Sequence, residues 1–347
     1  MKMKKLLAML MAGAMCVGML AGCGSTTDSK DEGTDTKGSA AGTSASNFDG
    51  KISFIISNKD EFQSALDQSA KAAAQARGIE LTSVDCAADQ DRELEAVQAA
   101  VQNGADAIVI ILADDTRADE VIEAAGDLPV VFVNRTPQDT SVLDEKHVYV
   151  GSDENDSGVM QGELLAEAMK ADDEDTANYI MLQGTAGLLH TTKRSEGVLN
   201  ALKEAGITAN AVTEPVDCGY DRSAAMDAVL SMIANGQDMS KVNVLIANND
   251  AMALGAIEAL RQSEVDMAGI KVVGVDGTNA GLQAIIDGTM TATVFQNATG
   301  QATASVQAAI NLASGADADE NISYEMKDNN IWIPFEKITA DNVADYY

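Results

Sequence analysis

The stretch IANNDAMALGAIEAL, residues 246–260, shows how this chain folds. A β-branched and apolar run, VNVLIA at 242–247, leads into Asn248, Asn249 and Asp250. Alanine, methionine, leucine and glycine follow at spacings that suit a tightly packed helix. Polar side chains therefore stand where a buried strand meets the start of a helix. Either Asn249 or Asp250 can cap that helix, and capping leaves the other one spare.

The same alternation of strand and helix recurs along the chain. The patterns predict strands at 51–57, 79–85, 106–112, 129–134, 147–151, 178–184, 209–217, 242–248, 271–277 and 291–296. They predict helices at 61–77, 91–103, 116–125, 156–170, 192–205, 222–235, 250–262, 279–287 and 300–313. Continuous apolar strands separated by helices indicate parallel sheets covered on both faces.

The alternation of strands and helices begins again after Asp153. We therefore predict an α/β fold with two doubly wound parallel-sheet lobes joined by a hinge. The predicted first lobe comprises residues 48–152 plus 297–328, and the second lobe comprises 153–296 plus 329–347. Ligands of such sheets bind at the carboxyl ends of the strands. The cleft between the lobes is therefore the expected site.

The N-terminal segment MKMKKLLAMLMAGAMCVGMLAGC has lysines before a short apolar run, which is typical of a secretory signal. Its ending, Leu20-Ala21-Gly22-Cys23, resembles a bacterial lipobox. That resemblance implies removal of residues 1–22 and lipidation of Cys23; an ordinary signal peptide that contains a cysteine is the alternative. The Ser/Thr/Gly/Asp-rich residues 23–47 are expected to form a flexible tether. The protein is then extracytoplasmic and anchored to the cell membrane.

Composition excludes one class of partner. The formal net charge is −31, which repels phosphate backbones, so we expect no nucleic-acid binding. Cys86 and Cys218 remain after the N-terminal cysteines are assigned. Export permits a disulfide between them, but two buried or half-buried thiols fit the sequence better because nothing else indicates a disulfide framework.

Polar and aromatic side chains gather after the predicted strands. Asn, Asp, Gln, Arg and His offer donors and acceptors in fixed positions, which suits hydroxyl groups that both donate and accept. Phe62 and Tyr220, one from each lobe, could enclose a flat ring; ordinary packing is the alternative for both. The candidate ligand-binding set is Asp60, Phe62, Asn134, Arg135, His190, Arg194, Tyr220, Asn249, Asp276 and Gln296.

From residue 51 to the end, the chain resembles the monosaccharide-binding periplasmic proteins of ABC transporters, the ribose- and galactose/glucose-binding group. The matching segments are ANNDAMALGAIEAL (247–260), VVGVDGTNAGLQAIIDGTMTATVFQNA (272–298) and VYVGSDENDSGVMQGELLA (148–166). The resemblance implies the type I periplasmic binding protein fold. It also implies capture of a hexose or pentose between the lobes and delivery to ABC permease subunits, by a protein expected to be a monomer.

The resemblance also assigns roles to single residues. Asn249 and Asp276 match the group's ligand-bonding Asn and Asp, and Gln296 matches a hinge-adjacent amide. Phe62 and Tyr220 match its stacking aromatics, and Asp60 matches a carboxylate of galactose-type members. Asn134-Arg135 combines features of both types, since ribose-type members carry Asp-Arg and galactose-type members Asn-Lys. His190 and Arg194 correspond to a galactose-type pair. The identity of the sugar therefore stays open.

Other functions fit less well. The chain shows no GxSxG, HExxH or phosphate-loop motif, so we expect no enzyme and no cofactor. Residues 153–158, DENDSG, match the first half of an EF-hand loop, but its twelfth position is Leu164, which cannot ligate calcium. We therefore expect no metal site. A signalling role, in which the sugar-loaded protein contacts a membrane receptor or histidine kinase, is the alternative to transport.

Overall fold

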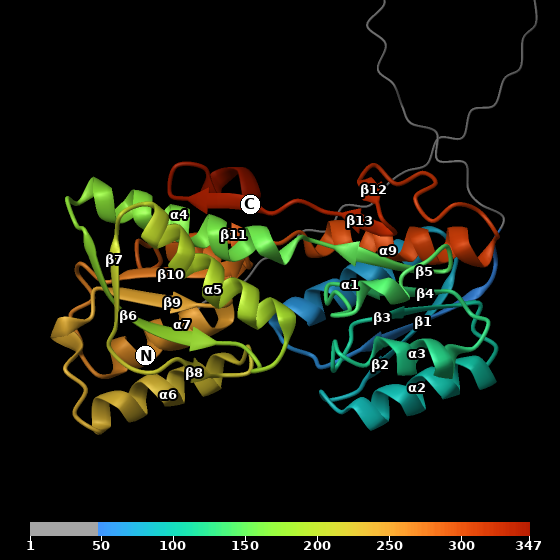
Figure 1. The fold of residues 1–347 in the computed structure, drawn as a ribbon, viewed down its shortest axis with the longest axis horizontal. Helices are drawn as coiled ribbons and strands as arrows, with labels where there is room; N and C mark the ends of the chain where they lie inside the picture. The colour runs from blue at the N-terminus through green and yellow to red at the C-terminus, as the bar shows by residue number, and fades with distance from the viewer. Residues whose placement is uncertain (1–47) are drawn as a thin grey trace, which may run out of the picture. The chain divides into compact units, whose positions relative to one another are not determined.

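A computed structural model of the chain describes residues 48–347 (Figure 1). The predicted signal peptide, the tether and the lipidation site Cys23 lie outside these residues. Within them, no helix combines the length and apolar character that a membrane span requires. The described strands form two seven-stranded sheets, each with helices on both faces.

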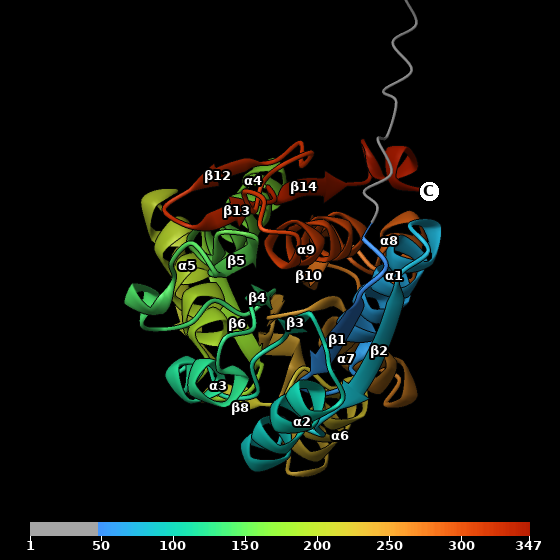
Figure 2. The ribbon, with the colours of Figure 1, turned by 90° about the vertical axis from the view of Figure 1, so that its right-hand side faces the viewer.

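The first sheet contains β1 (Lys51–Ile56), β2 (Glu80–Asp85), β3 (Ala107–Ile110), β4 (Val130–Val133), β5 (His147–Gly151), β12 (Glu325–Lys327) and β13 (Asn330–Trp332). Its strand order is β12-β13-β5-β4-β3-β1-β2. Helices α1 (Glu61–Ala76) and α9 (Ala298–Ala313) cover one face, and α2 (Gln90–Gln102) and α3 (Ala118–Ala125) cover the other (Figure 2).

The second sheet contains β6 (Thr176–Gln183), β7 (Thr208–Ala211), β8 (Val216–Asp217), β9 (Val244–Ala247), β10 (Lys271–Asp276), β11 (Ala292–Phe295) and β14 (Glu336–Thr339). Its order is β14-β11-β10-β9-β6-β7, with β8 also paired to β6. Helices α4 (Glu154–Ala171) and α5 (Leu189–Glu204) cover one face. Helices α6 (Arg222–Ala234), α7 (Asp250–Gln262) and α8 (Asn279–Ile286) cover the other. Short 3₁₀ turns occur at Thr140–Val142, Met239–Lys241 and Val343–Tyr346.

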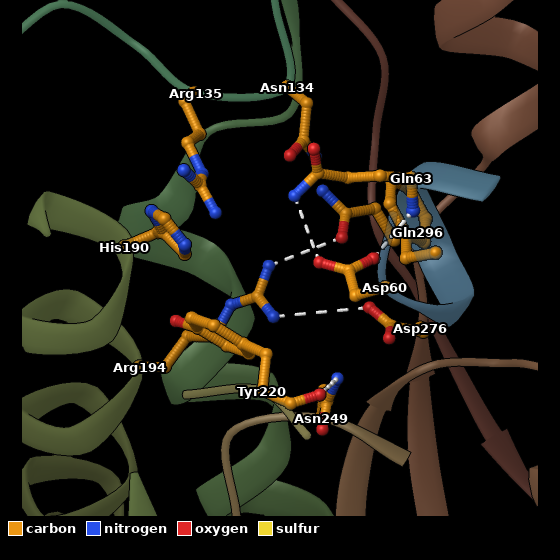
Figure 3. A pocket seen from close by; sticks show the side chains of 11 residues that line it. Asp60, Gln63, Asn134, Arg135, His190, Arg194, Tyr220, Asn249, Asp276 and Gln296 are labelled. Carbon is orange, nitrogen blue, oxygen red and sulfur yellow. Dashed lines mark hydrogen bonds and ion pairs between the residues drawn. The ribbon is translucent and has the colours of Figure 1, made fainter. Parts of the chain in front are cut away.

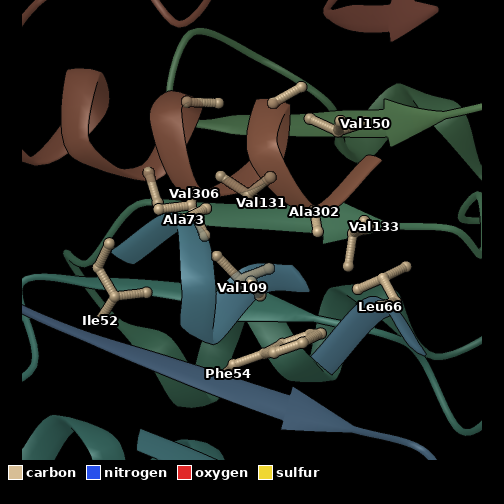
Figure 4. Close-up of a cluster of buried hydrophobic side chains, with 14 of the residues drawn as sticks. Ile52, Phe54, Leu66, Ala73, Val109, Val131, Val133, Val150, Ala302 and Val306 are labelled. Carbon is tan, nitrogen blue, oxygen red and sulfur yellow. The ribbon is translucent and has the colours of Figure 1, made fainter. Parts of the chain in front are cut away.

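Strand β3 explains the continuous apolar runs of the sequence. Val109 packs under α1 and α9 (Figure 4). Ile108 and Ile110 belong to the cluster on the opposite face, with residues of α2 and α3. Both faces of the strand are dry, so every position is apolar. Each fully buried side chain of this kind stabilises the fold by roughly 1.5–3 kcal/mol. The predicted α/β fold with two doubly wound lobes is confirmed.

Several details differ from the sequence prediction, which contained none of the strands β12, β13 and β14. The strand expected at 209–217 is two short strands, β7 and β8, because Pro215 between them has no N–H to donate to a sheet. Helix α5 begins at Leu189, before the expected residue 192. Strand β13 pairs with β5, so residues 330–332 belong to the first lobe. The crossing to β14 therefore follows Trp332 and does not lie at the expected 328/329 boundary.

The two remaining cysteines and the partial calcium motif also have clear places. Cys86 and Cys218 are buried free thiols, as expected. Asp153 caps α4 by accepting from the Asn155 N–H at 2.9 Å, and Glu154 binds an arginine described below. No cluster of potential metal ligands occurs among residues 48–347.

Candidate ligand-binding site

One cavity between the lobes is lined by all ten residues of the predicted set and by Gln63 (Figure 3). Its volume is about 20 Å³, which holds little more than a water molecule. Figure 3 shows the labelled side chains approaching this space from separate elements of both lobes. They converge because they follow the carboxyl ends of parallel strands, and the two sheets present those ends to each other.

The three polar residues after β9 perform three different tasks. Asn249 caps α7, since its Oδ1 accepts from the Met252 N–H at 2.9 Å. Asn248 is fully buried and accepts from the Gly184 N–H at 3.0 Å through Oδ1, which ties β9 to the end of β6. Asp250 is also fully buried and reaches the neighbouring strands β10 and β11. The residue left spare by capping is therefore a structural anchor.

Asp250 fixes the turn that carries Asp276. Its Oδ2 accepts from the Thr278 N–H at 2.8 Å, and its Oδ1 accepts from the Thr293 hydroxyl at 2.6 Å. A Cβ at Gly281 would lie 2.3 Å from Asp250 Oδ2, so only glycine admits this carboxylate. Burial raises the pKa of Asp250 to about 6.

Asp276 itself is 4% exposed and held in an unusual conformation. Its φ angle is +122°, a region that a residue with a Cβ rarely adopts and that typically costs about 1–3 kcal/mol. Burial raises the pKa of Asp276 well above its usual range, although Arg194 opposes this shift. Its Oδ2 is buried without a hydrogen-bond partner among the described residues. Backbone strain of this kind is common at functional sites, and buried polar atoms normally have partners.

Arg194 lies one helical turn after His190 on α5, so both side chains reach the cavity from one face of the helix. It donates from Nε and Nη2 to Glu154 at 3.0 and 2.8 Å, and from Nη1 to the Asn248 carbonyl at 2.9 Å. Nη2 also donates to Gln296 Oε1 at 3.2 Å. Burial lowers the pKa of Arg194, but the charge and hydrogen bonds of Glu154 outweigh burial and raise it above the usual arginine value.

Arg135 is equally buried but follows β4 in the first lobe. Its Nη1 donates to the Leu112 carbonyl at 2.7 Å, whereas Nε has no partner among residues 48–347. Burial lowers the pKa of Arg135, and Asp60 is the foremost charge that opposes the shift. Gln296 Nε2, between the lobes, is likewise buried without a partner in the described region.

Aromatic contacts form one wall of the cavity. The rings of His190 and Tyr220 stack with centroids 5.1 Å apart and planes inclined by 21°. The Tyr220 hydroxyl lies 2.7 Å from Thr191 Oγ1. A Cβ at Gly184 would lie 1.9 Å from the Tyr220 ring, so glycine is required there. Burial lowers the pKa of His190 well below its usual range, and Arg135 and Arg194 add to the shift. The surroundings of His190 therefore favour its neutral form.

The first-lobe wall contains a residue that sequence reasoning missed. Asp60 caps α1 by accepting from the Gln63 N–H at 2.7 Å, and the Gln63 Nε2 donates to the other Asp60 oxygen at 2.9 Å. Gln63 also accepts from the Ser57 hydroxyl at 2.9 Å. An acid followed three residues later by glutamine at a helix start is the pattern of a capping box, and it could have revealed this residue.

Direct contacts join the lobes at the rim of the cavity. Glu61 of α1 accepts from Arg222 of α6 through both carboxylate oxygens, at 2.8 and 3.0 Å. Asp115, which follows β3, accepts from the Leu189 N–H at the start of α5 at 2.7 Å. Gln138 donates to the Gly187 carbonyl at 3.2 Å. These contacts close the two lobes over the cavity.

Comparison with known proteins agrees with this architecture. Residues 52–317 match the family model described as a periplasmic binding protein domain. A D-galactose/methyl-galactoside binding periplasmic protein of Haemophilus influenzae is 30% identical over 324 residues, which cover 88% of this chain and 95% of that protein. A D-ribose/D-allose-binding protein of Pseudomonas aeruginosa is 30% identical over 257 residues, covering 73% of this chain and 75% of the relative.

A solved structure shows the same arrangement. The ABC transporter solute binding protein of Bacillus halodurans, crystallised with myo-inositol, has a TM-score of 0.73 and 28% identity, and the match covers 87% of this chain and 99% of that one. These relatives are binding proteins and not enzymes, in agreement with the sequence prediction. The chain belongs to the periplasmic binding protein family.

Proposed function

We propose that this protein is an extracytoplasmic substrate-binding lipoprotein that captures a monosaccharide between its lobes and delivers it to an ABC sugar importer. The observation that carries the proposal is a set of three buried polar atoms without partners among the described residues: Asp276 Oδ2, Gln296 Nε2 and Arg135 Nε. They belong to the second lobe, the hinge region and the first lobe, and all three residues line one cavity. Buried polar groups of this kind normally have partners.

Sugar hydroxyls would supply those partners. A hydroxyl can donate to the Asp276 carboxylate and accept from the Arg135 guanidinium or the Gln296 amide. The named ligands of the relatives and of the solved structure, galactose, ribose, allose and myo-inositol, are all compounds with several hydroxyl groups on a ring. Phe62 and Tyr220 remain the proposed partners of the apolar ring face.

Capture requires movement of the lobes. A monosaccharide ring is larger than the 20 Å³ enclosed here, so the lobes or their side chains must separate to admit it. A ligand that contacts both lobes stabilises the closed arrangement, because it loses its contacts with one lobe when they part. We propose that the closed form then docks on the permease.

The first test is a thermal-shift screen of residues 48–347 against monosaccharides, polyols and nucleosides. A ligand at a hundred times its dissociation constant adds about 2.7 kcal/mol to stability and raises the melting temperature. We expect a selective response to a sugar or cyclitol. A well-folded sample that responds only to nucleosides, or to nothing, would contradict the proposed ligand class.

Membrane attachment is tested separately on the full chain in a bacterial host. Lipidation of Cys23 predicts that the protein sediments with membranes and that Cys23→Ala shifts it to the soluble extracytoplasmic fraction. Equal membrane recovery of both forms would contradict the lipoprotein assignment without affecting sugar binding.

A further inference from the structure

Helix α2 carries one acidic side chain that is fully buried, Glu93. Its Oε2 accepts from the Ala113 N–H at 2.7 Å. Its other oxygen, Oε1, is buried without a hydrogen-bond partner among residues 48–347. Burying an acid with so few partners costs stability, and an apolar residue would pack in the same place without that cost. The packing of α2 therefore does not account for an acid at this position.

The backbone group that Glu93 binds lies just beyond a strand. Strand β3 ends at Ile110, so the peptide group between Leu112 and Ala113 follows the paired part of the sheet. Its N–H donates to Glu93, and its carbonyl accepts from Arg135 Nη1, also at 2.7 Å. Two buried side chains thus satisfy the two polar ends of one peptide group, where a neighbouring strand would normally do so.

Arg135 depends on this carbonyl for the direction of its guanidinium. The bond to Leu112 is the one hydrogen bond of its side chain among the described residues, and Nε has none. The charged or titratable side chains around the guanidinium are Asp60, Glu93, Asp115, His190 and Tyr220. None of these five forms a hydrogen bond with it within the described part of the chain. A tilt of the 112–113 peptide would therefore redirect the guanidinium.

The acid, the peptide and the guanidinium form a chain of three groups. Hydrogen bonds in such a chain polarise and strengthen one another, so the bond at the N–H makes the carbonyl a better acceptor. An ionised carboxylate also accepts more strongly than a neutral group. Ionised Glu93 therefore holds the peptide, and through it the guanidinium, more firmly than a neutral side chain would.

We propose that Glu93 is a positioning residue, which holds the Arg135 guanidinium toward the cavity through the 112–113 peptide. This role rests on the proposed function, in which Arg135 binds a sugar hydroxyl. Glu93 itself does not line the cavity. The binding machinery of the first lobe thus extends to α2, which contributes no side chain to the cavity wall.

The same segment also offers a second route to the ligand site. Asp115 Oδ2 accepts from the Leu189 N–H of the opposite lobe at 2.7 Å, and its Oδ1 accepts from Gln138 at 2.8 Å. A loosened segment could therefore weaken the contact between the lobes. If Glu93 acts through Arg135, its replacement has no effect once Arg135 is gone, whereas losses through the lobe contact would add.

The charge of Glu93 can be changed by pH as well as by substitution. Burial raises the pKa of Glu93 to about 7, above its ordinary value of 4.5. The charged or titratable groups that face it from other elements are Arg135, Asp114 and Cys86. Arg135 stays charged, and hydrogen bonds from Thr116 lower the pKa of Asp114. Burial raises the pKa of Cys86 to about 12, so Glu93 is the member of this group that changes charge between pH 5.5 and 8.

This charge has a stability cost with a defined sign. The folded state binds the Glu93 proton more strongly than the unfolded state, so stability falls as pH rises from about 4.5 to 7. Glu93→Gln removes this dependence and keeps an oxygen that accepts from Ala113. Its melting temperature at pH 8 should therefore stay level or rise, and a loss of affinity in this variant cannot be attributed to a weaker fold.

The test is isothermal titration with D-galactose, D-ribose, D-allose or myo-inositol, whichever the wild type binds most tightly. At pH 8 we expect affinity to fall about threefold in Glu93→Gln, which keeps a neutral acceptor, and about tenfold in Glu93→Met, which has none. At pH 5.5, where Glu93 is mostly protonated, Glu93→Gln should match the wild type. Neither change should have a further effect in an Arg135→Met background. The exposed neighbour Glu95→Gln on α2 is the control.

Each other outcome identifies what is wrong. Wild-type affinity in Glu93→Gln at pH 8 would overturn the role, even if Glu93→Met does not fold. A loss that adds to that of Arg135→Met would also overturn it and would assign Glu93 to the contact between the lobes. Wild-type affinity in Arg135→Met would remove the role and leave sugar binding by the remaining residues in place. No binding of any of the four compounds to folded wild-type protein would contradict both the role and the proposed function.

Discussion

Two arginines face one cavity from opposite lobes, and the protein bonds them in opposite ways. Arg194 donates to Glu154 through two nitrogens, to the Asn248 carbonyl and to Gln296. The Arg135 side chain makes one hydrogen bond among the described residues, to the Leu112 carbonyl. Both side chains are nearly inaccessible to solvent. Burial alone therefore does not reveal whether an arginine builds a lobe or is available to a ligand, whereas its unmet hydrogen bonds do.

The largest expected effect is a loss of stability on replacement of Arg194, the arginine with several hydrogen bonds to the protein. Arg194→Met leaves the Glu154 carboxylate buried without its cation, and breaking a buried pair in this way costs about 3–5 kcal/mol. Urea unfolding of the variant should show this loss. A denaturation midpoint equal to that of the wild type would mean that Arg194 does not stabilise its lobe. The proposed difference between Arg194 and Arg135 would then be wrong.

The next effect is on affinity, at Asp276, whose Oδ1 lies 3.9 Å from Arg194 Nη1 and whose Oδ2 has no hydrogen-bond partner among the described residues. Asp276→Ala removes a charged acceptor, worth up to about 3 kcal/mol, so sugar binding should weaken by roughly 100-fold and become undetectable at concentrations that saturate the wild type. The fold should persist, because burial already disfavours the charge. Titration calorimetry gives the affinity, and circular dichroism gives the fold. Asp276→Asn, which keeps the shape, serves as the second variant; wild-type affinity in both would contradict the site assignment.

Arg135→Met gives the matched partner of the first substitution. The change removes the same charge with the same replacement, but at a position with a single hydrogen bond to the protein. Stability should change by less than about 1 kcal/mol, since Arg135 forms no ion pair among residues 48–347 and its replacement also removes the cost of burying an unpaired charge. Affinity should fall by roughly tenfold, as expected for one hydrogen bond to a charged group. Equal destabilisation by the two Arg→Met changes would erase the distinction between the arginines.

The sequence predicted which residues line the cavity better than it predicted their hydrogen-bond partners. Strand ends could be located because continuous apolar runs such as 106–112 stop abruptly at polar residues, and parallel sheets bring those ends together. The pairing of Arg194 with Glu154 could not be foreseen, because 40 positions separate them and only the packing of α4 against α5 makes them neighbours. Likewise, nothing local distinguishes Asp250, which anchors a turn, from Asp276, which faces the cavity.

The lobe boundary failed for a related reason. Strand β13 has three residues, and its membership in the first sheet depends on pairing with β5, about 180 residues earlier. Short segments carry too little periodicity to choose between two sheets. Gln63 could have been found from its spacing to Asp60 at the helix start, but its hydrogen bond with Ser57 depends on how the end of β1 packs against α1.

The smallest expected effect comes from the rim contact that joins the two lobes. Arg222 binds Glu61 of the opposite lobe at 2.8 Å and Glu258 of its own lobe at 3.3 Å. Its side chain is 28% exposed, so each pair is worth about 0.2–1 kcal/mol and is screened by salt.

Glu61→Gln weakens only the contact between lobes, so it lowers the population of the closed form that binds sugar. We expect a roughly two- to fivefold loss of affinity at low salt, which disappears near 1 M salt. Glu258→Gln removes a carboxylate from the same arginine without touching the interface, and should leave affinity unchanged. Equal losses in the two variants would show that Arg222 acts within its own lobe. The two lobes would then be held together by the ligand and by the remaining contacts between them, those of Asp115 and Gln138.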